Sequence, residues 1–181
     1  MELKVRKVKL KSKDVKAIYF DSFPPNGRLP FCMMVVMSKL WNTKFLSFYD
    51  NDKLCGFIYF AVQFKQVFLM FFAVDKELRS KGYGREILNE LKKLYPMKKM
   101  IVTIEYGNTD KTKEQERRKR FYLNNDFKET GYLIRMGGVE QEILVRNGQF
   151  SKVKFRAFLA LYSNGILWPK IWKKYDVGKV R

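Results

Sequence analysis

The sequence predicts an α/β domain built on a mixed central sheet that is flanked by helices. In the middle of the chain, a strand pattern, a helix pattern and a second strand pattern follow one another directly. Turn residues join two further pairs of strand patterns, one near each end, as in β-hairpins. The 181 residues are 46% hydrophobic, which suffices for one core. We therefore expect one domain over residues 1–181, with a helical extension at about 151–181.

The N-terminal part predicts one strand and two helices. Apolar residues among lysines in Leu3–Leu10 indicate a strand with an exposed face. Ser12 is a candidate N-cap for a helix that runs to about Phe23. Pro24-Pro25-Asn26-Gly27 breaks this helix. The apolar run from Phe31 to about Leu40 is ambiguous, and we interpret it as a second helix.

A hairpin and a buried strand follow. Phe45–Tyr49 and Leu54–Val62 read as strands, and Asp50-Asn51-Asp52 between them is typical of a turn. Gln66–Val74 is apolar on both faces, as in a central strand. The next segment has apolar residues at helical spacing up to Pro96: Ile87, Leu88, Leu91 and Leu94.

The C-terminal half predicts a second hairpin between helices. Met100–Glu105 is a short strand, Gly107–Lys111 a loop and Glu114–Asn124 a helix, with Glu114–Arg118 and Glu116–Arg120 pairs at i,i+4. Gly137-Gly138 joins the strands of a hairpin, Phe127–Met136 and Glu140–Val145. Ser151–Tyr162 is expected to be helical, and Trp168–Lys174 a short turn of helix.

Several classes of chemistry are excluded or disfavoured by composition. The chain has no histidine, so catalysis by Ser-His-Asp or Cys-His groups is impossible, and no metal site is expected. Cys32 and Cys55 lie far apart in apolar segments and are expected to be buried and reduced. No apolar run is long enough to span a membrane, and Met1–Val5 does not resemble a signal peptide. We expect a cytoplasmic protein.

The net charge of +19 favours an anionic partner. Nucleic acid, an anionic lipid surface and a polyphosphate cofactor all qualify, and excess lysine that serves only solubility is the alternative. The basic segment Lys111–Arg120 is more typical of a solvated helix face than of an RNA-binding surface. Ser151–Tyr162 is likewise more typical of a helix packed on the sheet than of one lying on a membrane.

The turn after the strand Gln66–Val74 carries the most informative pattern. Gly82 and Gly84 permit a tight turn at the start of a helix, where free backbone amides and the helix dipole favour an anion. Arg79, Lys81 and Arg85 add positive charge. The alternative is an ordinary strand-to-helix turn, because neither the Walker A pattern nor the three-glycine dinucleotide pattern is present.

Two segments resemble the GNAT acetyltransferase superfamily. Arg79-x-x-Gly82-x-Gly84 resembles its acyl-CoA signature, [RQ]-x-x-G-x-[GA]. Arg117–Gly131 resembles the block R-x-x-F-Y-x-x-x-G-F that precedes a polar residue or two and a glycine. Asp126 replaces the usual first glycine at a helix C-cap, which is a mild departure because aspartate tolerates the left-handed conformation.

The resemblance implies how the chain binds and uses acetyl-CoA. The strands Gln66–Val74 and Met100–Glu105 would be the two parallel middle strands that splay apart in the family. The first strand would pair with the pantetheine arm and supply an oxyanion donor, and the amides of Ser80–Arg85 would hold the pyrophosphate. The implied cofactor-binding residues are Phe72, Val74, Arg79, Ser80, Lys81, Gly82, Tyr83, Gly84 and Arg85.

Two residues become candidates for proton transfer. Tyr122 occupies the position of the family's tyrosine and would protonate the leaving thiolate; the alternative is a core aromatic residue beside Phe121. Glu105 ends the second middle strand. If it were half-buried, its raised pKa would suit a general base, acting directly or through water, and the alternative is a carboxylate paired with a lysine.

The resemblance implies an acetyl-CoA-dependent N-acetyltransferase acting on a primary amine, either a small molecule or a peptide. Segments Phe23–Phe31 and Tyr132–Val139 would form the acceptor pocket, and a homodimer is compatible with the sequence. The alternative is a cationic module that binds RNA or an anionic surface on the same fold without turnover.

Overall fold

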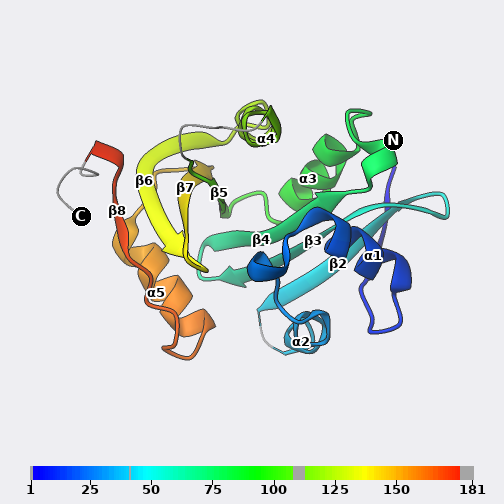
Figure 1. Cartoon of the computed structure of the whole chain (residues 1–181), viewed down its shortest axis with the longest axis horizontal. Coiled ribbons are helices and arrows are strands. Elements are labelled where there is room, and N and C mark those ends of the chain that lie inside the picture. The colour runs from blue at the N-terminus through cyan, green and yellow to red at the C-terminus, as the bar shows by residue number, and fades with distance from the viewer. Residues whose placement is uncertain (1, 41, 108–112, 176–181) are drawn as a thin grey trace. The chain divides into compact units, whose positions relative to one another are not determined.

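The computed structural model describes residues 2–40, 42–107 and 113–175, and the chain divides into two units of contacting residues (Figure 1). The first unit comprises residues 1–62 and 69–96, and the second comprises residues 63–68 and 97–181. Each unit is described by itself.

The first unit contains the predicted N-terminal hairpin. β2 and β3 are antiparallel around the predicted turn, with Phe45 opposite Tyr59 and Asp50 opposite Lys53. β1 pairs with β2 on its other side. The elements are β1 (Lys4–Lys7), α1 (Lys13–Ser22), a 3-10 helix (Pro25–Gly27), α2 (Phe31–Met37), β2 (Thr43–Asp50), β3 (Lys53–Gln63), β4 (Gln66–Val74), a 3-10 helix (Lys76–Leu78) and α3 (Tyr83–Leu94).

Three details of this half differ from the sequence-based predictions. Ser12 lies at the N-cap of α1, but its hydroxyl accepts the amide hydrogen of Lys9 and makes no capping bond to the helix. α2 ends at Met37, three residues before the predicted end near Leu40. Cys32 is exposed, whereas Cys55 is buried as expected, and both thiols are free. Hydrophobicity of the segment did not reveal which side of α2 faces solvent.

Aromatic rings dominate the core of the first unit. Tyr19 of α1 has no exposed surface and lies 5.4 Å from the Phe71 ring and 6.1 Å from the Phe57 ring. Its hydroxyl donates to the carbonyl of Leu29 and accepts the Leu29 amide hydrogen. This pair of bonds anchors the predicted acceptor segment Phe23–Phe31 to α1, and edge-to-face contacts of this kind add to the stabilisation from burial.

Gly56 allows β3, β4 and α3 to approach closely. A Cβ atom at Gly56 would lie 2.4 Å from the Ala73 carbonyl oxygen and 3.0 Å from Ile87 Cδ1. Next to it, the Asp75 amide donates to the Cys55 carbonyl at 2.9 Å. The missing side chain therefore sets the distance between the end of β4 and the helix that follows it, a role that no local pattern indicated.

Replacing Gly56 by alanine is expected to lower the free energy of unfolding by about 2 kcal/mol, because overpacking of a rigid backbone costs about 1–3 kcal/mol. Urea unfolding measures this change. Gly27→Ala is the matched control, since its Cβ would make ordinary contacts, the nearest at 3.6 Å. Equal losses in the two variants would contradict the assigned role of Gly56.

The second unit contains the second hairpin and the strand β5. β6 and β7 pair antiparallel around Gly137-Gly138, and β5 pairs with β7. The predicted loop Gly107–Lys111 lies, apart from Gly107, outside the described residues. The elements are β5 (Lys99–Glu105), α4 (Lys113–Leu123), β6 (Lys128–Met136), β7 (Val139–Arg146), α5 (Lys152–Tyr162) and β8 (Ile171–Lys173).

β4 and β5 begin at the same end of the sheet. The amide of Lys99, the first residue of β5, donates to the carbonyl of Lys65, just before β4, at 2.9 Å. A helical crossover through α3 joins the two strands, as is typical of parallel neighbours. The hydrogen-bonded order is β1-β2-β3-β4-β5-β7-β6-β8. The sheet is therefore mixed, as predicted, and divergence of the two middle strands stays a prediction.

The C-terminal segment corrects one prediction. Trp168–Lys174 was expected to form a turn of helix, but Ile171–Lys173 is the strand β8, antiparallel to β6 with Trp172 opposite Leu133 (Figure 1). Ile171 and Trp172 are buried. The edge of β6 offers unpaired backbone groups, so pairing there outweighs the local preference of a short segment.

α5 packs against the second unit as expected. Phe155 is fully buried, and its ring lies 5.1 Å from that of Phe68 at the start of β4. Ser151 accepts the amide hydrogen of Lys154 at the N-terminus of the helix. Among the described residues, no helix has the length and apolar character needed to cross a membrane.

Candidate active site

The glycine-bearing turn of the first unit is held in a defined conformation. Ser80 and Gly82 both have positive φ, at 65° and 90°. The Asp75 side chain accepts the Glu77 amide hydrogen, and buried Leu78 fixes the short helix before the turn. Only glycine adopts a φ of 90° without strain. The sequence prediction of a tight turn that needs glycine is confirmed at Gly82.

The start of α3 presents unpaired backbone amides. Arg85 and Glu86 donate their amide hydrogens to the carbonyl of Gly82, at 3.0 and 3.2 Å. The amides of Gly82, Tyr83 and Gly84 therefore precede the first turn of hydrogen bonds and have no acceptor within the helix. A Cβ at Gly82 would meet nothing within 4 Å. Three amides without an acceptor in the helix, at a positive helix end, suit an anion.

The structure narrows the predicted set of amides. The Arg85 amide is used within the helix, so it does not belong to the anion-binding group, although its exposed side chain still contributes charge. Ser80 and Lys81 are exposed next to it. The turn thus combines three unpaired amides with the cationic side chains of Lys81 and Arg85.

Two residues of the signature hold the turn itself. Arg79 Nε donates to the Val74 carbonyl at 3.3 Å, and its guanidinium reaches Ser22 Oγ at 3.4 Å. Tyr83 Oη donates to Asp50 Oδ2 at 2.8 Å, and this hydrogen bond raises the pKa of the tyrosine. Both side chains fasten the turn to neighbouring elements of the first unit, which adds a structural role to the predicted binding role.

Phe72 and Val74 share one face of β4. Both are half-buried, whereas Phe71 and Ala73 on the opposite face are buried. Alternation along a strand explains the difference. The prediction that backbone groups at these positions bind the cofactor is untested and stays a prediction.

Tyr122 is buried near the C-terminus of α4. Its ring packs against Phe121 and Phe127, each at 5.3 Å between ring centroids. The Phe127 amide donates to the Tyr122 carbonyl and closes the helix, with Asp126 left-handed at φ 70°, as its position at the C-cap predicts. Burial raises the pKa of Tyr122 well above its ordinary value, an effect that the charge of Arg118 only partly opposes.

Glu105 lies at the end of β5 with its side chain 42% exposed. Its predicted role as general base stays a prediction, and a paired carboxylate at a strand end was the alternative. Oε2 accepts a hydrogen bond from Gln115 at 3.1 Å and lies 3.8 Å from Arg118 Nη1. The strand ends here in solvent, where the carboxylate is held by a glutamine and an arginine of α4.

Sequence reasoning overlooked one face of α4. Gln115, Arg118 and Tyr122 follow one another at spacings of three and four residues, so they share a helix face. The first two contact Glu105, and the charge of Arg118 reaches Tyr122. Arg118 was predicted to pair with Glu114, but the structure pairs it with Glu105. The predicted Glu116–Arg120 pair is present at 3.9 Å.

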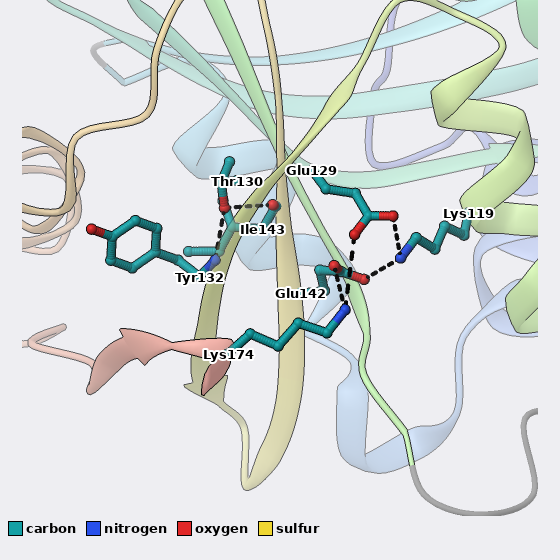
Figure 2. A network of polar contacts seen from close by, with 7 residues as sticks. All are labelled: Lys119, Glu129, Thr130, Tyr132, Glu142, Ile143 and Lys174. Atoms are coloured by element: carbon teal, nitrogen blue, oxygen red, sulfur yellow. Dashed lines mark hydrogen bonds and ion pairs between the residues drawn. The ribbon is translucent and has the colours of Figure 1, made fainter. Parts of the chain in front are cut away.

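A network of two lysines and two glutamates lies beside this face (Figure 2). Lys119 Nζ of α4 lies 2.7 Å from Glu129 Oε1 and 2.8 Å from Glu142 Oε2. Lys174 Nζ lies 3.2 Å from Glu142 Oε1 and 3.8 Å from Glu129 Oε2. The side chain of Glu142 is only 4% exposed. Local sequence carries no signal for this arrangement, because its members come from four segments.

The charges of the network stabilise one another. Burial alone would lower the pKa of Lys119, but its hydrogen bonds to Glu129 and Glu142 outweigh burial and raise it. The hydrogen bond from Lys119 lowers the pKa of Glu129. The contacts within the network therefore favour the charged forms of Lys119 and Glu129.

A bulge in β6 lies next to the network. The pairing with β7 shifts between Glu129 and Leu133, and Gly131 has a φ of 74°. The Thr130 hydroxyl donates to the Ile143 carbonyl at 2.8 Å and accepts the Tyr132 amide hydrogen at 3.1 Å (Figure 2). The hydroxyl thus satisfies backbone groups that the bulge removes from the ladder.

Comparison with known proteins gives one family match. Residues 41–129, just under half of the chain, match the family model of the acetyltransferase (GNAT) domain. This segment is similar to that domain and includes both sequence motifs up to Glu129. Among curated proteins, no sequence matches the chain significantly.

Solved structures agree on the fold. A protein assigned to the GNAT family from Bacteroides thetaiotaomicron superposes with a TM-score of 0.71 at 17% identity, covering 91% of this chain and 99% of its own. An aminoglycoside 6'-N-acetyltransferase complexed with coenzyme A gives 0.64 at 14% identity, covering 78% and 95%. The ribosomal-protein-S18-alanine N-acetyltransferase of Escherichia coli gives 0.58 at 16%, covering 83% and 96%.

Proposed function

We propose that the protein transfers an acetyl group from acetyl-CoA to a primary amine. The observation that carries the proposal is the start of α3, where the amides of Gly82, Tyr83 and Gly84 have no acceptor within the helix and the space beside Gly82 is open. This is the turn that bears the acyl-CoA signature of the superfamily.

The residues at this turn fit a pyrophosphate. Three amides at a helix N-terminus bind anionic oxygens, and the exposed side chains of Lys81 and Arg85 add two positive charges. No acidic side chain lies between Arg79 and Arg85 in the sequence. The coenzyme A bound by the aminoglycoside 6'-N-acetyltransferase, which has the same fold, is consistent with this assignment.

The residues proposed for proton transfer, Tyr122 and Glu105, both belong to the second unit. When bound, acetyl-CoA supplies an activated acetyl thioester. Tyr122 Oη holds a proton that it donates as the sulfur leaves, and Glu105 takes the proton from the acceptor's ammonium group, directly or through water. Because Glu105 is exposed and paired with Arg118, its assignment as base has less support than that of Tyr122 as acid.

Thermal unfolding tests cofactor binding. At about 100 times the Kd, acetyl-CoA is expected to add about 2.7 kcal/mol to the free energy of unfolding. Gly82→Asp should abolish this gain, because its carboxylate would repel the pyrophosphate. Gly137→Asp is the matched control: Gly137 also has a positive φ, and its Cβ would also meet nothing within 4 Å. An unchanged melting curve of the parent protein at millimolar acetyl-CoA would refute the proposal.

The basic helix α4 gives little support to the RNA-binding alternative. Arg118, Lys119 and Arg120 each form an ion pair, with Glu105, with Glu129 and Glu142, and with Glu116 respectively. Paired cations release fewer counterions from a polyanion than free ones. We therefore advance acetyl transfer alone.

We expect the acceptor to be a small amine with at most one or two positive charges, or one that also carries an anionic group. A net charge of +19 repels polycations, and screening at about 0.15 M salt confines this penalty to about 8 Å. The carboxylates of Glu105, Glu129 and Glu142 are already paired with cations.

Kinetics at low and high salt check this expectation. The value of kcat/KM should be higher for a neutral or anionic primary amine than for spermidine, and the difference should shrink as salt is added. A lead for spermidine at low salt that salt removes would reveal an acidic acceptor pocket and contradict the prediction.

A further inference from the structure

The outer side of α5 and the turn after it form an exposed apolar surface in the second unit. Along the helix, the exposed residues Val153, Ala157 and Leu161 recur every four positions, so they lie on one side. The inward side carries Phe155, Phe158 and Leu159. The exposed residues of this surface, called the α5 surface below, are Val153, Ala157, Leu161, Ile166, Leu167 and Trp168.

Large apolar side chains project from the turn after α5. Ile166 is 84% exposed and Trp168 66%, whereas a soluble protein typically buries such residues. By contrast, the side chains of Ile171 and Trp172, a few residues later, are buried. The two exposed side chains follow Leu161, the last exposed apolar residue of the helix, after the polar turn at residues 163–165.

Hydrogen bonds hold this turn in place. The Gly165 amide donates to the Ala160 carbonyl and the Asn164 amide to the Leu161 carbonyl, which together close the helix as a Schellman motif. Ser163 Oγ accepts the Leu167 amide hydrogen at 2.6 Å. Asn164 and Gly165 are left-handed, as this motif requires. A turn built in this way presents Ile166–Trp168 in a fixed orientation.

The segment that carries the α5 surface has charges of one sign. Residues 147–175 contain six basic and no acidic residues, and of the six Lys174 pairs with Glu129 and Glu142. Lys154 lies beside Val153 on the exposed side of the helix, and Lys170 follows Trp168 closely. Apolar residues that include tryptophan, bordered by lysines, are typical of helices that lie at the interface of an anionic bilayer.

We propose that the α5 surface binds the surface of a membrane that contains anionic lipids. The aliphatic side chains insert at the boundary of headgroups and acyl chains, the Trp168 indole sits at the headgroup level, and the lysines meet anionic headgroups. An RNA ligand would contact the cationic side chains but would not explain the exposed apolar side chains of Val153, Leu161 and Ile166. A second copy of the chain would bring two sets of like charges together.

Sedimentation of the full-length protein with lipid vesicles tests the proposal. The protein should bind vesicles of phosphatidylcholine with phosphatidylglycerol, bind phosphatidylcholine alone far more weakly, and dissociate as salt is added. Ile166→Ser with Trp168→Ser should weaken binding about tenfold or more, and Lys154→Gln about fivefold. Bound protein should show Trp168 fluorescence at shorter wavelengths, and Trp168→Phe should remove that change.

Leu94→Ser is the matched control, because Leu94 of α3 is 53% exposed and lies outside the α5 surface. It should leave vesicle binding unchanged. For each variant, the melting curve reports whether the protein folds. The shift of that curve on addition of acetyl-CoA reports cofactor binding. Equal binding by the parent and the double variant, or no preference for anionic lipid, would overturn the proposal. The proposal would also be overturned if the double variant lost RNA retention or self-association while its vesicle binding stayed unchanged.

Discussion

Replacing Tyr122 by phenylalanine is expected to lower kcat about 10²-fold and to leave the KM for acetyl-CoA nearly unchanged. The substitution removes the proton donor but keeps the ring, whose contacts with Phe121 and Phe127 are both at 5.3 Å. A factor of 10² is the low end for general acid catalysis. Steady-state kinetics on the proposed reaction give both constants.

The control is Tyr95→Phe. Tyr95 is a partly buried tyrosine of the first unit whose pKa burial also raises, and its ring packs against Phe60 at 5.8 Å. This variant should keep the parent kcat. Full activity of Tyr122→Phe would assign proton donation to water or another group and leave Tyr122 a packing role.

The raised pKa of Tyr122 adds a test by pH. Because the pKa lies well above the ordinary value of about 10, the hydroxyl stays protonated across neutral and mildly alkaline solution. The ratio of kcat between parent and Tyr122→Phe should thus be constant from about pH 6 to about pH 10. The contribution of Tyr122 to the free energy of unfolding is fully present below about pH 10 and is lost as the pH rises further. A ratio that falls near neutral pH would contradict the assignment.

Replacing Lys119 by methionine is expected to lower the free energy of unfolding by about 3 kcal/mol. It removes the ammonium group 2.8 Å from Glu142, a carboxylate only 4% exposed, which then retains Lys174 alone at 3.2 Å. Removing one partner of a buried ion pair costs about 3–5 kcal/mol. We expect a value at the lower end of this range because Lys174 still pairs with Glu142. Urea unfolding measures the change.

A double variant separates the charge effect from lost packing. Lys119→Met with Glu142→Leu removes both charges, so much of the stability should return. Arg120→Met is the control, since Arg120 makes an exposed pair with Glu116 that is worth about 0.5 kcal/mol or less. A double variant as unstable as Lys119→Met would show that the lysine acts by packing.

The network also predicts how stability changes with pH. The pKa of Glu129 is lowered, so its contribution is present above the unfolded value of about 4.3 and is lost as pH falls through the folded value. The pKa of Lys119 is raised, so its contribution is present below about 10.4 and is lost as pH rises through the folded value. Lys119→Met should remove the alkaline dependence and weaken the acidic one, because Glu142 and Lys174 still lower the pKa of Glu129.

The sequence by itself determined most of the order of elements and the position of the glycine-bearing turn. Strands and hairpins followed from alternation and turn residues, as at Asp50-Asn51-Asp52 and Gly137-Gly138, and both hairpins are present. Gly82 lies in the predicted tight turn, and Asp126 has the left-handed conformation expected at its C-cap. These properties depend on neighbouring residues only, because helix spacing, turn geometry and caps are local.

Only the tertiary structure decided which residues meet. The edge of β6 makes Ile171–Lys173 a strand, and the close approach of β3 and β4 requires Gly56. Exposure of Glu105 and its pairing with Arg118 depend on how α4 lies beside β5. The network around Glu142 joins four segments of the chain. Contacts between distant residues form when elements pack, and local periodicity carries no record of the partner that each side chain will find.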